Sequence, residues 1–139
     1  MKKISWIIAG ISLFLIILAT SCTKDSEDPI IPDQAPSISL QNGTDYVYRN
    51  DTFTVNTPIK IGIRAFANTS TNANLVDFTF SRTLGGNTQT FDSVFSAATF
   101  NVDLLTNANP QVGIETFIFT VKDKNGKMKA VTLLITTNP

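Results

Sequence analysis

Residues 113–126 read GIETFIFTVKDKNG, and residues 127–136 continue as KMKAVTLLIT. In both halves, apolar side chains recur at every second position, which is the period of a strand with one buried face. Asn125-Gly126 separates the halves, and this dipeptide between alternating segments is the strongest short-range hairpin signal. The stretch therefore predicts an antiparallel hairpin closed by a type I′ turn, with positive φ at both central residues.

The same alternation, broken by short polar turns, runs through the chain from Ser37 onward. Only residues 98–106 suit a short helix, and their β-branched and aromatic content favours a strand instead. About seven short strands with turns at this spacing predict an all-β fold, an antiparallel β-sandwich. Extended segments are expected at 37–40, 46–49, 53–55, 59–65, 76–81, 88–94, 100–104, 117–122 and 131–136.

Residues 113–123, followed by Asn125-Gly126, resemble the last two strands of bacterial immunoglobulin-like domains. The resemblance implies an immunoglobulin-like sandwich over residues 37–139. The cysteine pair and core tryptophan of antibody domains are missing, since Trp6 and Cys22 both precede this region. The fold hosts many functions, so the resemblance implies none in particular.

The N-terminus has the layout of a secretory signal. Met1-Lys2-Lys3 is positive, residues 4–18 are almost wholly apolar, and Ala19-Thr20-Ser21 are small. An apolar run of about 15 residues is shorter than the roughly 20 that a membrane-spanning helix needs. Residues 1–21 are therefore expected to be a signal peptide.

Cys22, the single cysteine, follows the small residues directly, and this arrangement resembles the lipobox of bacterial lipoproteins. The resemblance implies that the Cys22 thiol is lipidated, that the signal is cut before it, and that the new N-terminus is acylated. Ala19 stands where lipoboxes most often have leucine. Ordinary signal cleavage is the alternative, and it would leave an unpaired thiol in an oxidising compartment.

Residues 23–28, TKDSED, resemble the lysine-plus-acidic tract that follows the lipidated cysteine in surface-exposed lipoproteins of the Bacteroidetes. The resemblance implies export to the outer face of the outer membrane. A merely solvated linker is the alternative. Pro29, Pro32 and Pro36 and the charges of this region predict a flexible tether over residues 22–36.

Residue types limit the chemistry. The chain has no histidine, and Cys22 is committed to the anchor, so imidazole and thiol mechanisms lack their groups. Carboxylates occur at Asp77, Asp92, Asp103 and Glu115, on separate expected strands and mostly at outward positions. We expect no catalytic residues, no metal site and no cofactor.

Charge also limits the partners. Lys2 and Lys3 are removed with the signal peptide, so the mature chain has nine Lys and Arg residues and eleven Asp and Glu residues. This balance offers no basic stripe for nucleic acid. The remaining partners are the membrane, through the lipid anchor, and an envelope protein or a glycan.

Two sets of residues are candidates for partner contact. Tyr46 and Tyr48 share one face of an expected strand, where they either stack on a sugar or border the core. The alternation predicts that the side chains of Phe66, Leu75 and Ile118 point outward from their strands. There they either form an apolar contact patch or are covered by other segments.

The sequence as a whole predicts a membrane-tethered, cell-surface, non-enzymatic binding or adhesion module. A passive structural or spacer domain of an outer-membrane assembly is the alternative. A joined apolar patch would favour a protein partner, a tyrosine-lined groove would favour a glycan, and an evenly polar surface would favour the spacer.

Overall fold

The computed structural model describes residues 34–139, so the predictions for the signal peptide, for Cys22 and for most of the tether lie outside the described residues. The described part contains eight strands and no helix, and therefore no helix that could cross a membrane. The strands are β1 (Ser37–Leu40), β2 (Asp51–Thr54), β3 (Pro58–Phe66), β4 (Leu75–Leu84), β5 (Asn87–Ala97), β6 (Thr99–Asn107), β7 (Gly113–Asp123) and β8 (Met128–Asn138).

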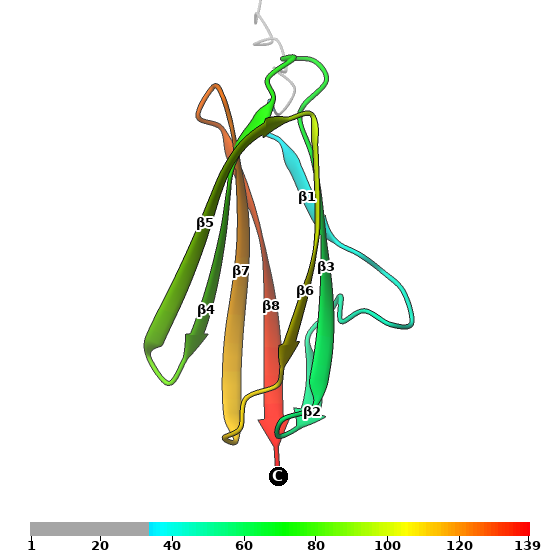
Figure 1. The fold of residues 1–139 in the computed structure, drawn as a ribbon, viewed down its shortest axis with the longest axis vertical. Helices are drawn as coiled ribbons and strands as arrows, with labels where there is room; N and C mark the ends of the chain where they lie inside the picture. Colours follow the sequence, from blue (N-terminus) through cyan, green and yellow to red (C-terminus); the bar gives the residue numbers. More distant parts are fainter. Residues whose placement is uncertain (1–33) are drawn as a thin grey trace, which may run out of the picture. The chain divides into compact units, whose positions relative to one another are not determined.

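The strands form two sheets, one in the order β1-β3-β6 and the other in the order β2-β8-β7-β4-β5 (Figure 1). The predicted all-β sandwich is thereby confirmed, with eight strands instead of about seven. β1, β3 and β6 thus form one layer, and β4, β7 and β8 belong to the other. One pairing differs from the prediction, because β2 runs parallel to β8 and the larger sheet is mixed.

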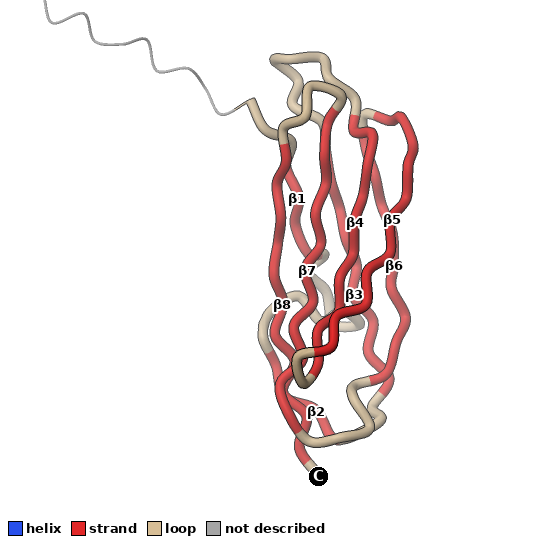
Figure 2. The backbone as a smooth tube through the Cα atoms, turned by 90° about the vertical axis from the view of Figure 1, so that its left-hand side faces the viewer, coloured by secondary structure: helices blue, strands red, loops and turns tan. Residues whose placement is uncertain are grey.

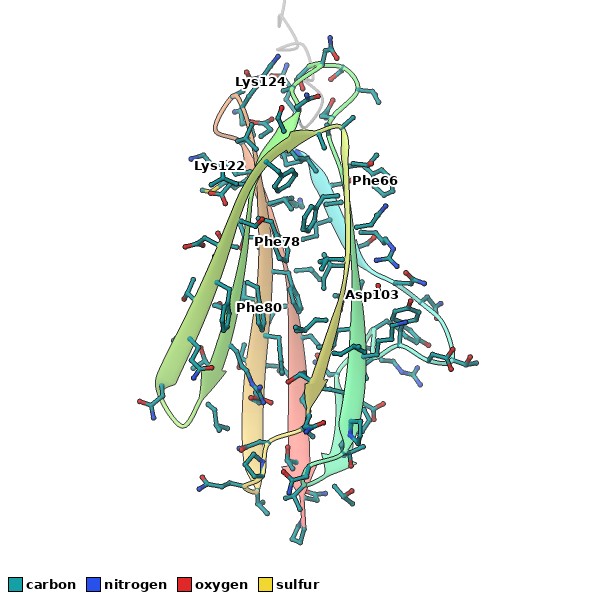
Figure 3. All side chains as sticks on the ribbon, viewed as in Figure 1. Phe66, Phe78, Phe80, Asp103, Lys122 and Lys124 are labelled. Atoms are coloured by element: carbon teal, nitrogen blue, oxygen red, sulfur yellow. The ribbon has the colours of Figure 1, made fainter. Side chains whose placement is uncertain are left out.

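The core lies between the two sheets and is rich in phenylalanine. Phe117 and Phe119 are fully buried on β7, and Phe80 stacks on Phe119 with a centroid distance of 5.2 Å. Phe78 reaches across to Phe100 of the other sheet at 4.7 Å. Figure 3 shows Phe78 and Phe80 pointing into the space between the layers. The period-two pattern of the sequence thus produces the buried face that it predicts.

The β7–β8 turn differs from the expected type I′ turn. Gly126 has a positive φ of 81°, but Asn125 is not among the residues with positive φ. The Asp123 carboxylate accepts hydrogen bonds from the backbone N–H groups of Asn125 and Lys127, both at 2.9 Å, and this organises a longer loop. The two-residue turn with positive φ at both positions is instead Gly85-Gly86, at 54° and 82°.

Residues 46–49, expected to be extended as a strand, belong to the connection between β1 and β2 (Figure 2). Two isolated backbone bonds join this connection to β3 in place of a strand ladder: Gln41 N–H donates to the Gly62 carbonyl at 2.7 Å, and Val47 N–H donates to the Lys60 carbonyl at 2.8 Å. The strand predicted over residues 98–106 is confirmed, because β6 contains all of them except Ala98.

The expectation that Leu75 points outward is wrong, because its side chain is fully buried. The pairing of β4 with both of its neighbours shifts between Leu75 and Asp77. A shift of this kind reverses the alternation of side chains on one side of it. Leu75 therefore joins Phe78 and Phe80 in the core, and Val76 is left half-buried.

Candidate functional site

The candidate site is a groove formed by the connection between β1 and β2 together with the beginning of β3. The groove has a volume of about 550 Å³ and is lined by residues 42–49, Asp51, Phe53 and residues 58–60. We call it the tyrosine groove, because it brings Tyr46 and Tyr48 together.

Asp103 on β6 is the centre of the polar contacts beside the groove. The Tyr46 hydroxyl donates to its Oδ2 at 2.9 Å, and Lys60 Nζ lies 3.1 Å from the same oxygen. Arg64 Nη2 donates to Oδ1 at 3.0 Å. Asp103 pairs with Gly62 in the β3–β6 ladder. Lys60 and Arg64 lie two residues before and two residues after Gly62, so their side chains lie on the same face of the sheet and flank Asp103. Figure 3 shows Asp103 on the outer side of this pair of strands.

Gly62 allows the Tyr46 ring to lie directly on the sheet. A Cβ atom at Gly62 would stand 2.8 Å from Tyr46 Cε1 and 2.8 Å from Gln41 Cβ, closer than real Cβ atoms approach. Lys60 Nζ lies 4.4 Å from the centroid of the same ring, within cation–π range. Tyr46 is thus held by its surroundings and positions the connection.

Tyr48 is the aromatic ring in the groove that remains available. Tyr48 is 37% exposed, and the Arg49 guanidinium lies 5.6 Å from the centroid of its ring. An exposed tyrosine offers both an apolar ring face and a polar tip to a ligand. The two tyrosines, which the sequence predicted to share one face of a strand, therefore differ in their surroundings: Tyr46 lies on the sheet, and Tyr48 lines the groove with its ring partly exposed.

The contacts around Asp103 shift two pKa values. The hydrogen bond from Tyr46, followed by those from Lys60 and Arg64, holds the pKa of Asp103 below its ordinary value of 3.8. The hydrogen bonds with Tyr46 and Asp103 raise the pKa of Lys60 above its ordinary value of 10.5. Both shifts favour the charged forms and therefore the ion pair.

These shifts predict how the contact depends on pH. A lowered carboxyl pKa stabilises the folded state above the ordinary value of 3.8, and this stabilisation is lost as the pH falls through the lowered pKa. We expect the NMR signals of the Tyr46 ring to stay constant from pH 7 to about 4, and to move towards free tyrosine at lower pH. Asp103→Asn should remove this acid transition. A Tyr46 signal that moves equally in both proteins would contradict the assignment.

The apolar candidates do not form one patch. Phe66, at the end of β3, is 48% exposed, whereas Ile118 is half-buried on β7 in the other sheet. With Leu75 in the core, the three side chains lie in different places. The structure thus brings together the tyrosines of the prediction and separates its apolar residues.

A second polar cluster was not predicted. Glu115 is fully buried and paired with the Arg82 guanidinium, which also lies over the Phe117 ring at 5.4 Å. The alternation of side chains along β7 indicates this burial, because Glu115 lies two residues before Phe117 and four before Phe119 and therefore on the same, buried face of the strand. No group of three or more His, Cys, Asp or Glu side chains within residues 34–139 is arranged to hold a metal ion.

Comparison with known proteins supports the fold. No family model matches the chain, and no curated protein matches it. Among solved structures, the chain is similar to a DUF4466 family protein from Parabacteroides merdae, with a TM-score of 0.51 and 12% sequence identity. The alignment covers 73% of this chain but only 44% of the other, so this chain spans less than half of that protein's length. At this identity the likeness concerns the fold alone.

Proposed function

We propose that the protein is a lipid-anchored binding module of the bacterial cell surface that recognises a glycan through the tyrosine groove. The observation that carries this proposal is the Tyr48 ring, exposed within a groove of about 550 Å³. Ligand pockets typically measure about 300–1,000 Å³, so the groove is large enough for one or more sugar rings.

The groove joins aromatic and polar groups in the way that a sugar requires. A sugar ring has an apolar face that packs on an aromatic side chain, and hydroxyl groups that need donors and acceptors. Arg49, Asp45 and Asp51 line the same groove and supply both kinds of polar group. The ion pair of Lys60 with Asp103 fixes the groove wall, so that less conformational freedom is lost on binding.

The anchor supports the same function. The sequence around Cys22 predicts a lipidated N-terminus, followed by a tether that ends where β1 begins at Ser37. Anchoring many copies on one surface makes weak contacts effective through multivalency. A protein with such a tether needs no high affinity at a single groove.

The distribution of acidic groups favours binding over catalysis. A carboxylate mechanism of glycoside hydrolysis needs two acidic groups on opposite sides of the scissile bond. Beside the groove, Asp103 is engaged by two cations and Tyr46. Asp51 accepts a hydrogen bond from Thr52 N–H at 2.8 Å, which leaves Asp45 as the remaining carboxylate of the groove lining. We therefore assign the groove a non-enzymatic role.

A glycan array tests the proposal. The protein from Cys22 onward, displayed on lipid vesicles, should bind a subset of bacterial or host glycans. Tyr48→Ala should lower the signal at least about tenfold, since aromatic anchors dominate binding energy. Tyr48→Phe keeps the ring and should retain most of the binding. Absence of binding to every glycan would contradict the proposal and favour a spacer domain, and equal binding by Tyr48→Ala would move the site away from the groove.

A further inference from the structure

A row of three phenylalanine rings crosses the larger sheet and ends at its edge strand, β5. Phe119 of β7, Phe80 of β4 and Phe91 of β5 occupy directly opposite positions in the strand ladders. Phe80 stacks on Phe119 with ring centroids 5.2 Å apart and on Phe91 with ring centroids 5.6 Å apart, at interplanar angles of 13° and 11°. The first two residues of the row are buried, whereas Phe91 is 57% exposed. The row therefore ends on a largely exposed ring.

The backbone of β5 is open along the same edge. Within residues 34–139, β5 pairs with β4 alone, through a regular ladder over residues 87–94. Figure 1 shows β5 and β6 diverging from the short connection between them. An open edge presents unpaired N–H and C=O groups, and natural proteins protect such edges with proline, with lysine or by making the strand short.

The edge of β5 carries none of these protections. Residues 87–94 read NTQTFDSV, are all exposed, and contain neither proline nor lysine. The edge strands β1 and β2 have only four residues each. The edge strand β6 is longer, but every second residue along it is half-buried. Residues 87–94 are therefore the edge segment of the described domain that is best suited to accept a further strand.

A second copy of this chain fits the open edge in one register. An antiparallel pair of β5 strands has a two-fold axis, and an axis at Phe91 places the Phe91 residues of the two copies directly opposite each other. Opposite residues of an antiparallel pair point to the same face of the sheet, so the rings of both copies join into one continuous row.

The single charge of residues 87–94 is compatible with this register. Asp92 then lies opposite Thr90 of the second copy, and their side chains can form a hydrogen bond. An axis one residue further along the strand would oppose two Asp92 carboxylates, which is destabilising. The row of rings and the position of Asp92 thus favour the same pairing.

Antiparallel pairing also determines how the two copies are oriented. Ser37, where β1 begins, pairs with Phe66, and Phe66 pairs with Thr99, two residues after the end of β5. The chain therefore enters the domain at the end where β5 finishes. In an antiparallel pair of β5 strands, the entry ends of the two copies point in opposite directions. Such a pair suits copies that are held on two surfaces facing each other.

We propose that the protein binds a second copy of itself through β5, antiparallel about Phe91, and thereby joins copies anchored in two opposing membranes. The self-association rests on the β5 edge and the row of rings, whereas its action between membranes rests on the lipid anchor of the proposed function. A single strand pair buries little surface, so each contact is weak, and the many anchored copies make the contact effective.

Sedimentation of the full-length protein in excess polyoxyethylene detergent measures the self-association. We expect the wild type to show a monomer–dimer equilibrium. Phe91→Lys should raise the dissociation constant at least about tenfold, because it removes the ring contact and places like charges opposite each other. Phe91→Asp should do the same. An equimolar mixture of Phe91→Lys and Phe91→Asp should recover the dimer, because only the mixed pair places a cation opposite an anion.

Leu105→Lys is the matched control, because Leu105 is 74% exposed on β6, the edge strand of the other sheet. It should leave the dissociation constant unchanged. Since Phe91 is largely exposed, the circular dichroism spectra of its variants should match that of the wild type. A wild type that stays monomeric, a dimer that persists in Phe91→Lys, or a mixture that does not recover the dimer would overturn the proposal.

Clustering of vesicles tests the orientation of the two copies. Two populations of vesicles that carry the anchored protein and different dyes should cluster, and energy transfer between the dyes should fall to background with Phe91→Lys. Neither assay contains a glycan, so the results do not depend on the tyrosine groove. A dimer in detergent without clustering would overturn the opposing arrangement. Protein that does not stay on the vesicles would contradict the lipid anchor and, with it, this arrangement.

Discussion

Replacing Phe119 with alanine should lower the free energy of unfolding by about 3–5 kcal/mol, the usual cost of removing a fully buried phenylalanine. The Phe119 ring is fully buried at the centre of β7 and stacks on Phe80 at 5.2 Å. Phe78 and Phe117 lie within 6.5 Å of it by ring centroid. Because these neighbours belong to strands paired on both sides, the cavity left by the ring cannot collapse.

Urea denaturation followed by circular dichroism measures the effect. Thr120→Ala is the matched control, because Thr120 is adjacent in β7 but lies on the opposite, outer face. It should change stability by less than about 1 kcal/mol. If Phe119→Ala leaves too little folded protein to measure, Phe119→Leu should show a smaller loss in the same direction. A neutral Phe119→Ala would refute the core described here.

The strands were predictable because one physical pattern dominates them. The alternation at Phe117, Phe119 and Val121 reports a sheet face buried against another layer, and each of these residues is in the core. The β6 strand was recognised for the same reason, through Phe100, Val102 and Leu104.

Irregular features were not predictable, because they depend on tertiary contacts. The register shift after Leu75 turns this residue inward, and nothing in the neighbouring residue types marks it. Residues 46–49 alternate like a strand, but the Tyr46 ring settles on Gly62 and fixes them as a loop. The turn at Asn125 differs because the Asp123 side chain bonds to its backbone.

The candidate site was only partly accessible from the sequence. The sequence predicts Tyr46 and Tyr48 as candidates, but the position of the Tyr46 ring depends on Lys60 of β3 and Asp103 of β6, which are distant in the sequence. The ion pair of Arg82 with Glu115 joins the neighbouring strands β4 and β7. The burial of its carboxylate is predictable from the alternation along β7, which places Glu115 on the same face as Phe117.

Replacing Cys22 with serine should abolish membrane attachment through the lipid. The expectation rests on the sequence, where a single cysteine directly follows an apolar segment and three small residues. Two or more acyl chains hold a protein firmly to a bilayer, at about 0.8 kcal/mol per buried methylene, whereas the serine variant can carry no thioether lipid. The change should therefore be close to all-or-none.

Intact-mass spectrometry of membrane and soluble fractions, for the wild type and for Cys22→Ser, measures the lipid anchor itself. We expect a wild-type species in the membrane fraction that begins at Cys22 and carries the added mass of a lipid, and a serine variant that is an uncleaved precursor or soluble. A mature-sized, acylated Cys22→Ser protein in the membrane fraction, or a wild-type protein without lipid, would contradict it.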